Sequence, residues 1–218
     1  MVIDLVMQAG LILVTIFMFL WMQKIPQNLF TKFRYRNRSS YAAKRHFIIG
    51  AQLLAKSRST KDRPSAIKLA RSAAEEADKS ISLDPKDAAS HILKALALDV
   101  QGFSTSALEA LDVALSPLTS KSLSGGERGD ALFKRAEIKI KSSKRGLVDS
   151  AVDDLVESVK LKGDNATAFR LLGECYEKKE LKEEAVDAYA GALRADPNCT
   201  AARDAMNRLS PNSAKSDK

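Results

Sequence analysis

Few residues in this chain of 218 are of the types that carry out acid–base, nucleophilic or metal chemistry. Its two histidines, His46 and His91, stand far apart, and neither has a nearby partner in the sequence spaced for a general base or a metal site. The two cysteines, Cys175 and Cys199, are too few for a disulfide framework and are not spaced as zinc ligands. Cys175 precedes Tyr176 in a helical pattern, where a free cysteine commonly behaves as a small hydrophobic residue. We therefore expect no catalytic residue, no metal and no cofactor.

The segment Leu123–Glu127, LSGGE, echoes the signature of ATP-binding-cassette ATPases. A nucleotide site would also need a phosphate loop of the GxxxxGK[ST] kind, which the sequence lacks. The Ser and Gly residues around this segment are typical of a flexible linker. The acidic residues elsewhere run beside Lys and Arg along helix faces, as on a solvated surface. We predict that the chain is not an enzyme.

The net charge of +8 is concentrated at the N-terminal end of the chain. Residues 1–63 hold 11 Lys or Arg against Asp4 and Asp62, a net charge of +9, whereas residues 64–218 hold 24 Lys or Arg against 25 Asp or Glu. Proteins that bind nucleic acid usually carry a basic surface on the folded domain itself. Because the excess lies beside an apolar segment instead, we expect membrane contact and no nucleic-acid partner.

A single transmembrane anchor is predicted within residues 1–25. The stretch Leu5–Met22 has no charged side chain, and a helix of this length covers about 27 Å, close to the hydrocarbon thickness of a bilayer. A cleaved signal peptide would need a basic start and small residues before the cut, but this N-terminus carries Asp4 and no cation. We therefore predict an uncleaved signal anchor, with residues 2–25 in the membrane.

Basic residues follow the apolar stretch and predict its orientation. Positive charge concentrates on the cytoplasmic side, so we expect the N-terminus to be translocated and the rest to be cytosolic. Pro26 ends the anchor, and residues 26–40 form a basic juxtamembrane segment suited to lipid headgroups. The residues expected at the membrane surface are Lys24, Lys32, Arg34, Arg36, Arg38, Lys44 and Arg45. The strongly apolar anchor favours the endoplasmic reticulum over a mitochondrial or plastid outer membrane.

The rest of the chain has the composition and spacing of an all-α repeat protein. Aromatic residues make up only 6%, and the abundance of Ala, Leu, Lys and Glu favours helix over strand. Residues 165–198 place distinctive residues at a set spacing, namely Phe169, Leu172, Gly173, Tyr176, Ala185, Tyr189, Ala192 and Pro197. This pattern resembles the tetratricopeptide repeat (TPR), a pair of helices with a period of 34 residues. The resemblance implies that Gly173 and Ala185 let the paired helices approach closely, and that the aromatic residues and Leu172 fill the space toward the previous pair.

Weaker copies of the pattern lie upstream in the same register. Pro85 and Pro197 are 112 residues apart, which is three periods plus ten residues. We place the ten extra residues in loops around Lys121–Arg128 and Ser142–Lys144. His91 falls where the repeat packs a side chain.

The first pair would consist of a helix over Tyr41–Lys56 and a second helix that begins at Pro64, joined by a loop ten residues longer than usual. Its inward-facing residues would be Phe47, Ile48, Ala51 and Leu54. Residues 200–209 are predicted to form a capping helix and residues 210–218 a disordered tail. The sequence thus predicts an α-solenoid of about four TPR-like helix pairs over residues 41–209.

The resemblance also implies a binding surface, because in this family the first helix of each pair lines a concave peptide groove. The matching positions are occupied by Phe133, Glu137, Arg170, Glu174 and Glu177, with Lys134 and Lys141 alongside. A subset of the family clamps acidic C-terminal carboxylates with Lys, Asn and Arg, at positions occupied here by Ile48, Gln52, Leu93, Asp130 and Lys134. Only Lys134 could serve there, so binding of chaperone tails in that mode is not supported.

The leading functional hypothesis is a membrane-anchored adaptor or scaffold whose groove binds a protein or peptide partner on the cytosolic face. The alternative is a structural subunit of a membrane complex, whose groove is permanently filled by a neighbour. The layout also resembles signal-anchored import receptors of organelles, in which an apolar helix is likewise followed by a basic flank. The sequence leaves the oligomeric state open.

Overall fold

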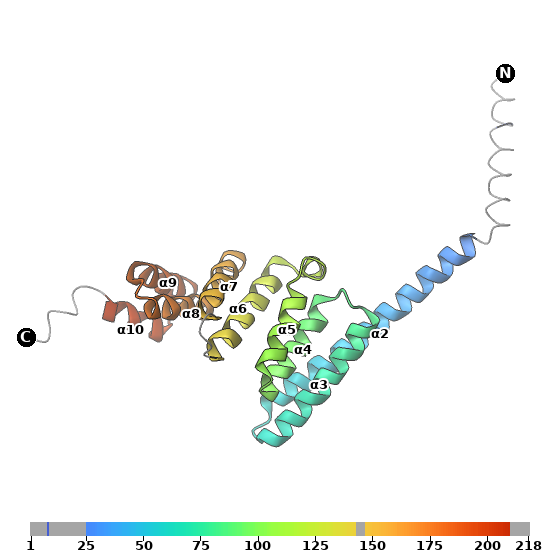
Figure 1. Cartoon of the computed structure of the whole chain (residues 1–218), viewed down its shortest axis with the longest axis horizontal. Helices are drawn as coiled ribbons and strands as arrows, with labels where there is room; N and C mark the ends of the chain where they lie inside the picture. The colour runs from blue at the N-terminus through green and yellow to red at the C-terminus, as the bar shows by residue number, and fades with distance from the viewer. Residues whose placement is uncertain (1–7, 9–24, 143–146, 210–218) are drawn as a thin grey trace, which may run out of the picture.

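The computed structural model describes residue 8 and residues 25–142 and 147–209, and of residues 25–39 it describes the backbone alone. All regular structure in this part of the chain is helical (Figure 1). The α-helices are α2 (Ile25–Ser59), α3 (Arg63–Leu83), α4 (Ala88–Gln101), α5 (Ser104–Ala114), α6 (Gly125–Lys141), α7 (Leu147–Leu161), α8 (Ala166–Lys178), α9 (Lys182–Ala195) and α10 (Thr200–Leu209), with a 3-10 turn η1 (Ser120–Ser122) before α6.

The helices form an elongated array of four antiparallel pairs, α2–α3, α4–α5, α6–α7 and α8–α9, followed by α10 (Figure 1). This arrangement confirms the predicted α-solenoid, including the capping helix over residues 200–209. The predicted anchor and the predicted tail, residues 210–218, lie outside the described residues apart from Gln8 and Ile25. No helix among the described residues combines the length and the apolar character that crossing a bilayer requires.

The first pair differs from its prediction in where its extra residues lie. Only residues 60–62 separate α2 from α3, so there is no enlarged loop, and the additional length is helical. Asp62 caps α3 by accepting a hydrogen bond from the backbone N–H of Ser65 at 3.0 Å, and Pro64 occupies the first turn. Helix α2 also continues without a break through the predicted juxtamembrane segment, residues 26–40.

The segment around LSGGE is a helix start and not a flexible linker. Ser124 and Glu127 form a capping box, in which the Ser124 hydroxyl accepts from the Glu127 N–H and the Glu127 carboxylate accepts from the Ser124 N–H at 2.8 Å. Gly125 and Gly126 therefore lie in the first turn of α6. The insertion predicted around Lys121–Arg128 is thus centred earlier, on residues 115–124, which include η1. Of the insertion predicted around Ser142–Lys144, residues 143 and 144 lie outside the described residues.

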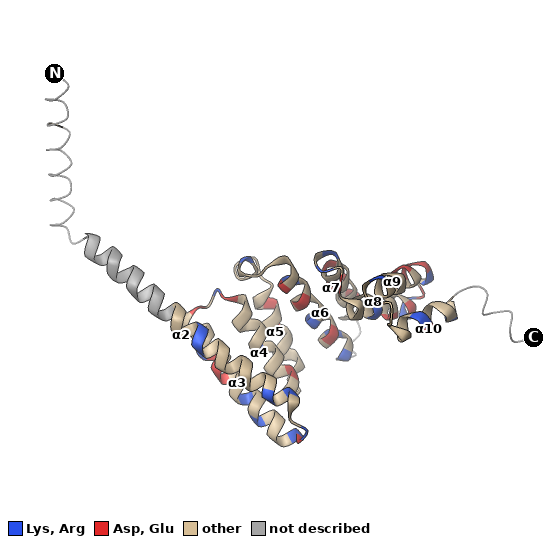
Figure 2. Ribbon diagram, turned by 180° about the vertical axis from the view of Figure 1, so that it is seen from behind, with Lys and Arg blue, Asp and Glu red and all other residues tan. Residues whose placement is uncertain are grey.

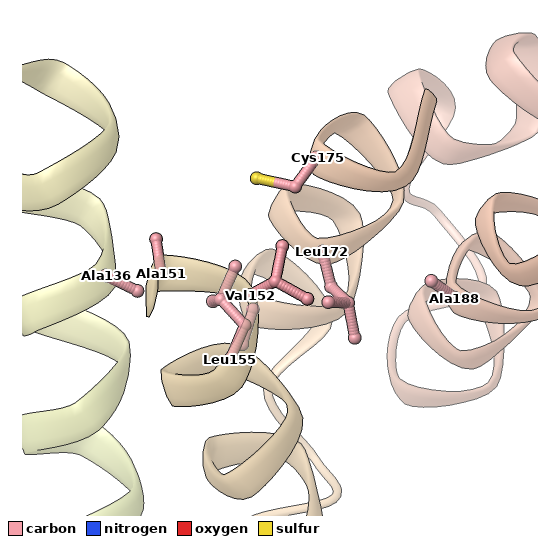
Figure 3. Packing of buried hydrophobic residues seen from close by; sticks show 8 residues of the cluster. Ala136, Ala151, Val152, Leu155, Leu172, Cys175 and Ala188 are labelled. Atoms are coloured by element: carbon pink, nitrogen blue, oxygen red, sulfur yellow. The ribbon is translucent and has the colours of Figure 1, made fainter. Parts of the chain in front are cut away.

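Among the residues that the structure describes, buried side chains gather in four clusters, each between neighbouring helices of the array. Figure 3 shows the cluster in which Leu155 of α7 faces Leu172 and Cys175 of α8. Alanine dominates these clusters, and the interior face of α3 consists of Ala70, Ala73, Ala74, Ala77 and Ser80. Small side chains let the helices approach closely, and this explains why so few aromatic residues are needed.

Two glycines in the last pair lie against aromatic rings. A Cβ atom on Gly173 would lie 2.7 Å from the ring of Tyr189, and one on Gly191 would lie 2.5 Å from the ring of Phe169. The expected close approach of α8 and α9 at Gly173 is therefore present. Phe169 and Tyr189, however, pack within the last pair and toward α10, and not against the previous pair as predicted. Leu172 does pack toward α7, and Tyr176 touches both clusters.

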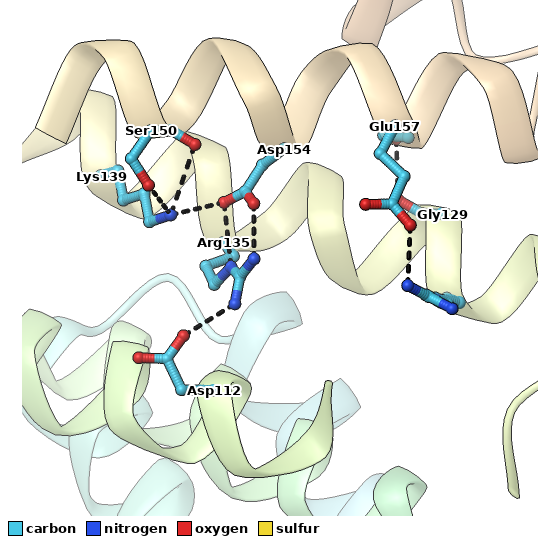
Figure 4. A network of polar contacts seen from close by, with 9 residues as sticks. Asp112, Gly129, Arg135, Lys139, Ser150, Asp154 and Glu157 are labelled. Carbon is cyan, nitrogen blue, oxygen red and sulfur yellow. Dashed lines mark hydrogen bonds and ion pairs between the residues drawn. The ribbon is translucent and has the colours of Figure 1, made fainter. Parts of the chain in front are cut away.

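A partly buried polar network joins three consecutive helices (Figure 4). Arg135 of α6 donates to both carboxylate oxygens of Asp154 on α7, at 2.9 and 2.5 Å, and to Asp112 of α5 at 2.8 Å. Lys139 donates to the same Asp154 at 2.7 Å and to the Ser150 hydroxyl at 2.7 Å. Asp154 is only 5% exposed, and its charge is balanced by two cations.

Candidate functional site

A cleft with a volume of about 530 Å³ is lined by the first helices of the first three pairs, α2, α4 and α6. Its walls are mainly apolar and include Phe47 and Leu54 of α2, Ile92 and Leu93 of α4, and Phe133 of α6. Concave apolar clefts with a few charged groups are the usual form of binding sites. We call this cleft the groove.

The direction of the groove follows from contacts among its helices. The Ser80 hydroxyl donates to the Ala43 carbonyl at 2.9 Å and lies 2.8 Å from the Ser90 hydroxyl, so residue 43 of α2 is beside the start of α4. The Ala88 N–H donates to the Ser122 hydroxyl at 3.0 Å, which places the start of α6 beside the start of α4 as well. The three lining helices therefore run in parallel, and the end of α2 lies at the opposite end of the groove from the start of α6.

Four charged residues line the groove, and they differ in their partners. Glu127 is held in the capping box, and Asp130 accepts from Lys162 at 2.8 and 2.9 Å. Lys134 pairs with Glu137 of the same helix at 2.5 Å. The fourth residue, Arg58, is exposed near the end of α2.

Of the residues predicted to form a peptide groove, Phe133 and Lys134 line it and Glu137 lies beside it as the partner of Lys134. Lys141 lies farther along α6, with its Nζ atom 3.7 Å from Asp99, and is not part of the lining. The side chain of Arg170 is engaged by Glu174 one turn later on α8. The structure therefore does not place the seven predicted residues in one groove.

Glu174 and Glu177 line a second, smaller cleft of about 340 Å³ between α8 and α10. Glu177 accepts from the Tyr189 hydroxyl at 2.6 Å and from Arg208 of α10 at 2.8 Å. Burial tends to raise the pKa of Glu177, but these hydrogen bonds outweigh it and hold the pKa below its usual value. The hydrogen bonds between Glu177 and Arg208 therefore hold α10 against α8 at this cleft.

The sequence prediction of the groove did not include the apolar residues that α2 and α4 contribute to it. Among them are Ala51, Leu54, Ile92 and Leu96. The periodicity that placed Phe47, Ala51 and Leu54 on an inward face was a usable signal, since a first helix turns the same side toward the core and the groove. Ile48, predicted to face inward, is instead 54% exposed.

The histidines and Cys175, which were considered above for chemistry, contact other residues of the fold or are buried in it. His46 Nδ1 lies 2.6 Å from Glu76 of α3, a partner 30 residues away that sequence spacing did not reveal. His91 is buried with its Nε2 atom 3.0 Å from the Pro85 carbonyl, and Cys175 is 1% exposed, so burial raises the pKa of its thiol. Within residues 25–142 and 147–209, no group of three or more His, Cys, Asp or Glu is placed to hold a metal ion.

Most residues predicted at the membrane surface lie where side chains are not described. Lys24 is outside the described residues, and Lys32, Arg34, Arg36 and Arg38 lie in the part of α2 described by its backbone alone. Lys44 and Arg45 are exposed on α2.

Comparison with known proteins supports the resemblance of this chain to TPR proteins. A family model described as tetratricopeptide repeat matches residues 143–198. No protein in a collection of curated sequences matches the chain. Solved structures also resemble this chain, but their sequence identity to it is low, so they show a likeness of fold alone.

Three solved structures illustrate that likeness. MamA from Desulfovibrio magneticus RS-1, residue 41 to its end, is 16% identical with a TM-score of 0.57, over 81% of this chain and 98% of that one. Pseudomonas aeruginosa pilF is 17% identical with a TM-score of 0.60, over 78% and 68%. A chain of the APC/C hetero-tetramer Cut9–Hcn1 is 18% identical with a TM-score of 0.55, over 67% and 28%.

Proposed function

We propose that this TPR-type chain is a membrane-anchored adaptor whose groove binds a segment of a partner protein. The observation that carries the proposal is the apolar groove along α2, α4 and α6. Stacked helical repeats present extended concave surfaces of this kind, and such surfaces bind peptides by burying a few apolar side chains. The fold suggests a protein-interaction scaffold, and no described cluster of residues suggests an enzyme.

The anchor and the orientation of the chain are part of the same proposal. Residues 2–25 would span the membrane, the N-terminus would be translocated, and the repeats would face the cytosol, with the endoplasmic reticulum the favoured membrane. The support comes from the apolar run Leu5–Met22 and the cations that follow it. Residues 26–40 would then belong to a helix, α2, that leads from the membrane directly into the repeats.

Binding in the groove can be tested by photo-crosslinking in cells. A photoreactive amino acid would replace Ala55, an exposed residue of the groove wall, or Asp153, an exposed residue of α7 that is not part of that wall. The proposal predicts a discrete crosslinked protein with the label at residue 55 and none at residue 153. Substitution of Ile92 by Glu, in the part of the groove wall that α4 contributes, should remove the crosslink. The same crosslinks at both positions would contradict the proposal.

Topology can be tested with sequons that the chain already carries. Asn37, Asn165 and Asn198 each stand two residues before Ser or Thr, and Asn198 is exposed between α9 and α10. With cytosolic repeats, deglycosidase should leave the mobility of the cellular protein unchanged, and protease added outside microsomes should digest the repeats. A deglycosidase-sensitive, protease-protected chain would place the repeats in the lumen and overturn the orientation.

A further inference from the structure

We infer that the partner segment carries acidic residues at one end of an apolar stretch, and that the turn between α2 and α3 receives them. This inference rests on the proposed function and specifies the chemistry of the ligand. The turn holds Lys56, Arg58, Lys61 and Arg63, all of them exposed. We call these four residues the basic turn. Figure 2 shows Lys and Arg gathered at this free end of the first pair.

The basic turn is not neutralised by the described part of the chain. Its one acidic residue, Asp62, is committed to capping α3 through the Ser65 N–H. Hydrogen bonding to the side chain and the backbone of Ser65 lowers the Asp62 pKa. Among residues 40–142 and 147–209, no ion pair involves any cation of the turn. Elsewhere in the array cations are commonly paired, as Lys162 is with Asp130 and Lys179 with Asp149. Four neighbouring cations without acidic partners repel one another, and an external anion relieves that repulsion.

Arg58 joins the basic turn to the groove, because it belongs to both. The groove therefore has two unlike ends. At one end, beside the starts of α4 and α6, its charged residues are Glu127 and the Lys162-paired Asp130. Lys134, farther along α6, is paired with Glu137, and at the other end stands Arg58 with the rest of the turn. A segment that lies along the apolar walls with its acidic end at Arg58 matches this charge arrangement.

The same arrangement disfavours the two other anionic partners, nucleic acid and lipid. A polynucleotide along the groove would meet Glu127 and Asp130, and it would gain little from walls made by Phe47, Leu93 and Phe133. Helix α2, 35 residues long, spans about 52 Å, so the basic turn lies at the end of α2 remote from the proposed anchor. An acidic protein segment is the partner that fits both surfaces.

The test measures the binding of three kinds of labelled peptide to the full-length protein in neutral detergent micelles. The peptides share one apolar helical face of Leu and Ala, and carry at one end a run of Glu, Gln or Lys, each made in both sequence directions. We expect the Glu peptide to bind most tightly in its better direction, the Lys peptide most weakly, and the difference to shrink in high salt.

Charge reversal then locates the preference. The variant R58E/K61E/R63E should bind the Glu peptide about tenfold more weakly and lose the preference over Gln, since each exposed ion pair contributes only modestly. The matched control K160E/K182E/R194E changes the net charge equally at exposed positions away from the groove, and it should bind like the wild type. Circular dichroism would verify that both variants keep the helical content of the wild type.

The outcomes separate this inference from the proposed function. Equal binding of all three peptides, abolished by Ile92→Glu and unchanged by reversal of the basic turn, would keep the groove and overturn the acidic-end inference. No binding of any peptide would overturn both. A labelled oligonucleotide, or vesicles of anionic phospholipid, that bound through the basic turn while the Glu peptide did not would replace the acidic segment with that partner and overturn the inference.

Discussion

Replacement of Gly173 by alanine probes the close contact between α8 and α9. The added Cβ would lie 2.7, 2.8 and 2.9 Å from three ring atoms of Tyr189. That ring cannot easily move aside, because it is 1% exposed and its hydroxyl donates to Glu177 at 2.6 Å. The substitution therefore forces either the ring or the whole of α9 to shift.

The expected effect is the balance of opposing contributions to the free energy of unfolding. Alanine favours a helix interior over glycine by about 1 kcal/mol, which would stabilise α8. Overpacking of a filled interior costs about 1–3 kcal/mol, and a displaced Tyr189 would also weaken its hydrogen bond to a charged carboxylate, worth roughly 1.5–3 kcal/mol when intact. We expect Gly173→Ala to destabilise the last pair by about 1–2 kcal/mol, and Gly173→Leu to destabilise it more.

Urea unfolding followed by circular dichroism would give the overall change, and amide hydrogen exchange would locate it. Because repeat arrays are stabilised mainly between neighbours, protection should fall in α8, α9 and α10 and remain nearly unchanged in α3 and α4. The control is Gly126→Ala in the first turn of α6, where an added Cβ meets nothing within 4 Å. There the helix preference acts alone, so the control should be neutral or slightly stabilising.

A double variant tests whether the clash with the Tyr189 ring causes the destabilisation. In a Tyr189→Leu background the clashing ring atoms are gone, so Gly173→Ala should no longer destabilise the protein. If Gly173→Ala were as harmless as Gly126→Ala in the otherwise native chain, the close approach of α8 and α9 at residue 173 would be refuted, and with it the repeat register assigned there.

Three further predictions concern charge and reactivity. Asp154→Ala removes the carboxylate shared by the buried Lys139 and the partly buried Arg135 and should cost about 3 kcal/mol in urea unfolding, whereas its exposed neighbour Asp153→Ala should be nearly neutral; equal effects would contradict the network. The lowered pKa of Glu177 adds stability above its usual value of 4.5 that is lost as the pH falls through the folded-state pKa, so Glu177→Gln should make stability fall less on acidification below pH 4.5; an unchanged pH profile of unfolding would refute this. Cys175, buried and with a raised thiol pKa, should resist alkylation until unfolding, while the partly exposed Cys199 reacts first; mass spectrometry after timed alkylation would reveal the opposite order if the packing is wrong.

The helix pairing could be predicted from the sequence because it depends on local size patterns. Gly173, Ala185 and Pro197 constrain backbone approach and helix ends within one repeat, so their spacing carried the register. The first pair was harder, since its extra residues could be placed in a loop or in longer helices. The extra residues are helical because the Asp62 carboxylate caps α3 and Pro64 fits its first turn. Helix α3 can therefore begin just after α2 ends.

The candidate site was predicted only in part because a groove is a property of several helices at once. Phe133 was found from its repeat position and Lys134 as its neighbour in the sequence. The residues of α2 and α4 could be assigned to the groove only after the relative placement of three pairs was known. Long-range polar partners were hidden for the same reason. His46 and Glu76 meet across two helices, and Arg135 reaches Asp112 and Asp154 on two different neighbours.

The alanine-lined face of α3 has a consequence for how this protein tolerates sequence change. Ala70, Ala73 and Ala77 are completely buried, so truncation to a smaller side chain could remove at most a methyl group from each. Enlargement is the damaging direction, because each added carbon must separate α3 from α2 or α4. Over evolutionary time we expect this face to exchange alanine for serine or glycine and to exclude valine and leucine. The repeats can then diverge freely on their outer surfaces while the spacing between helices stays constant.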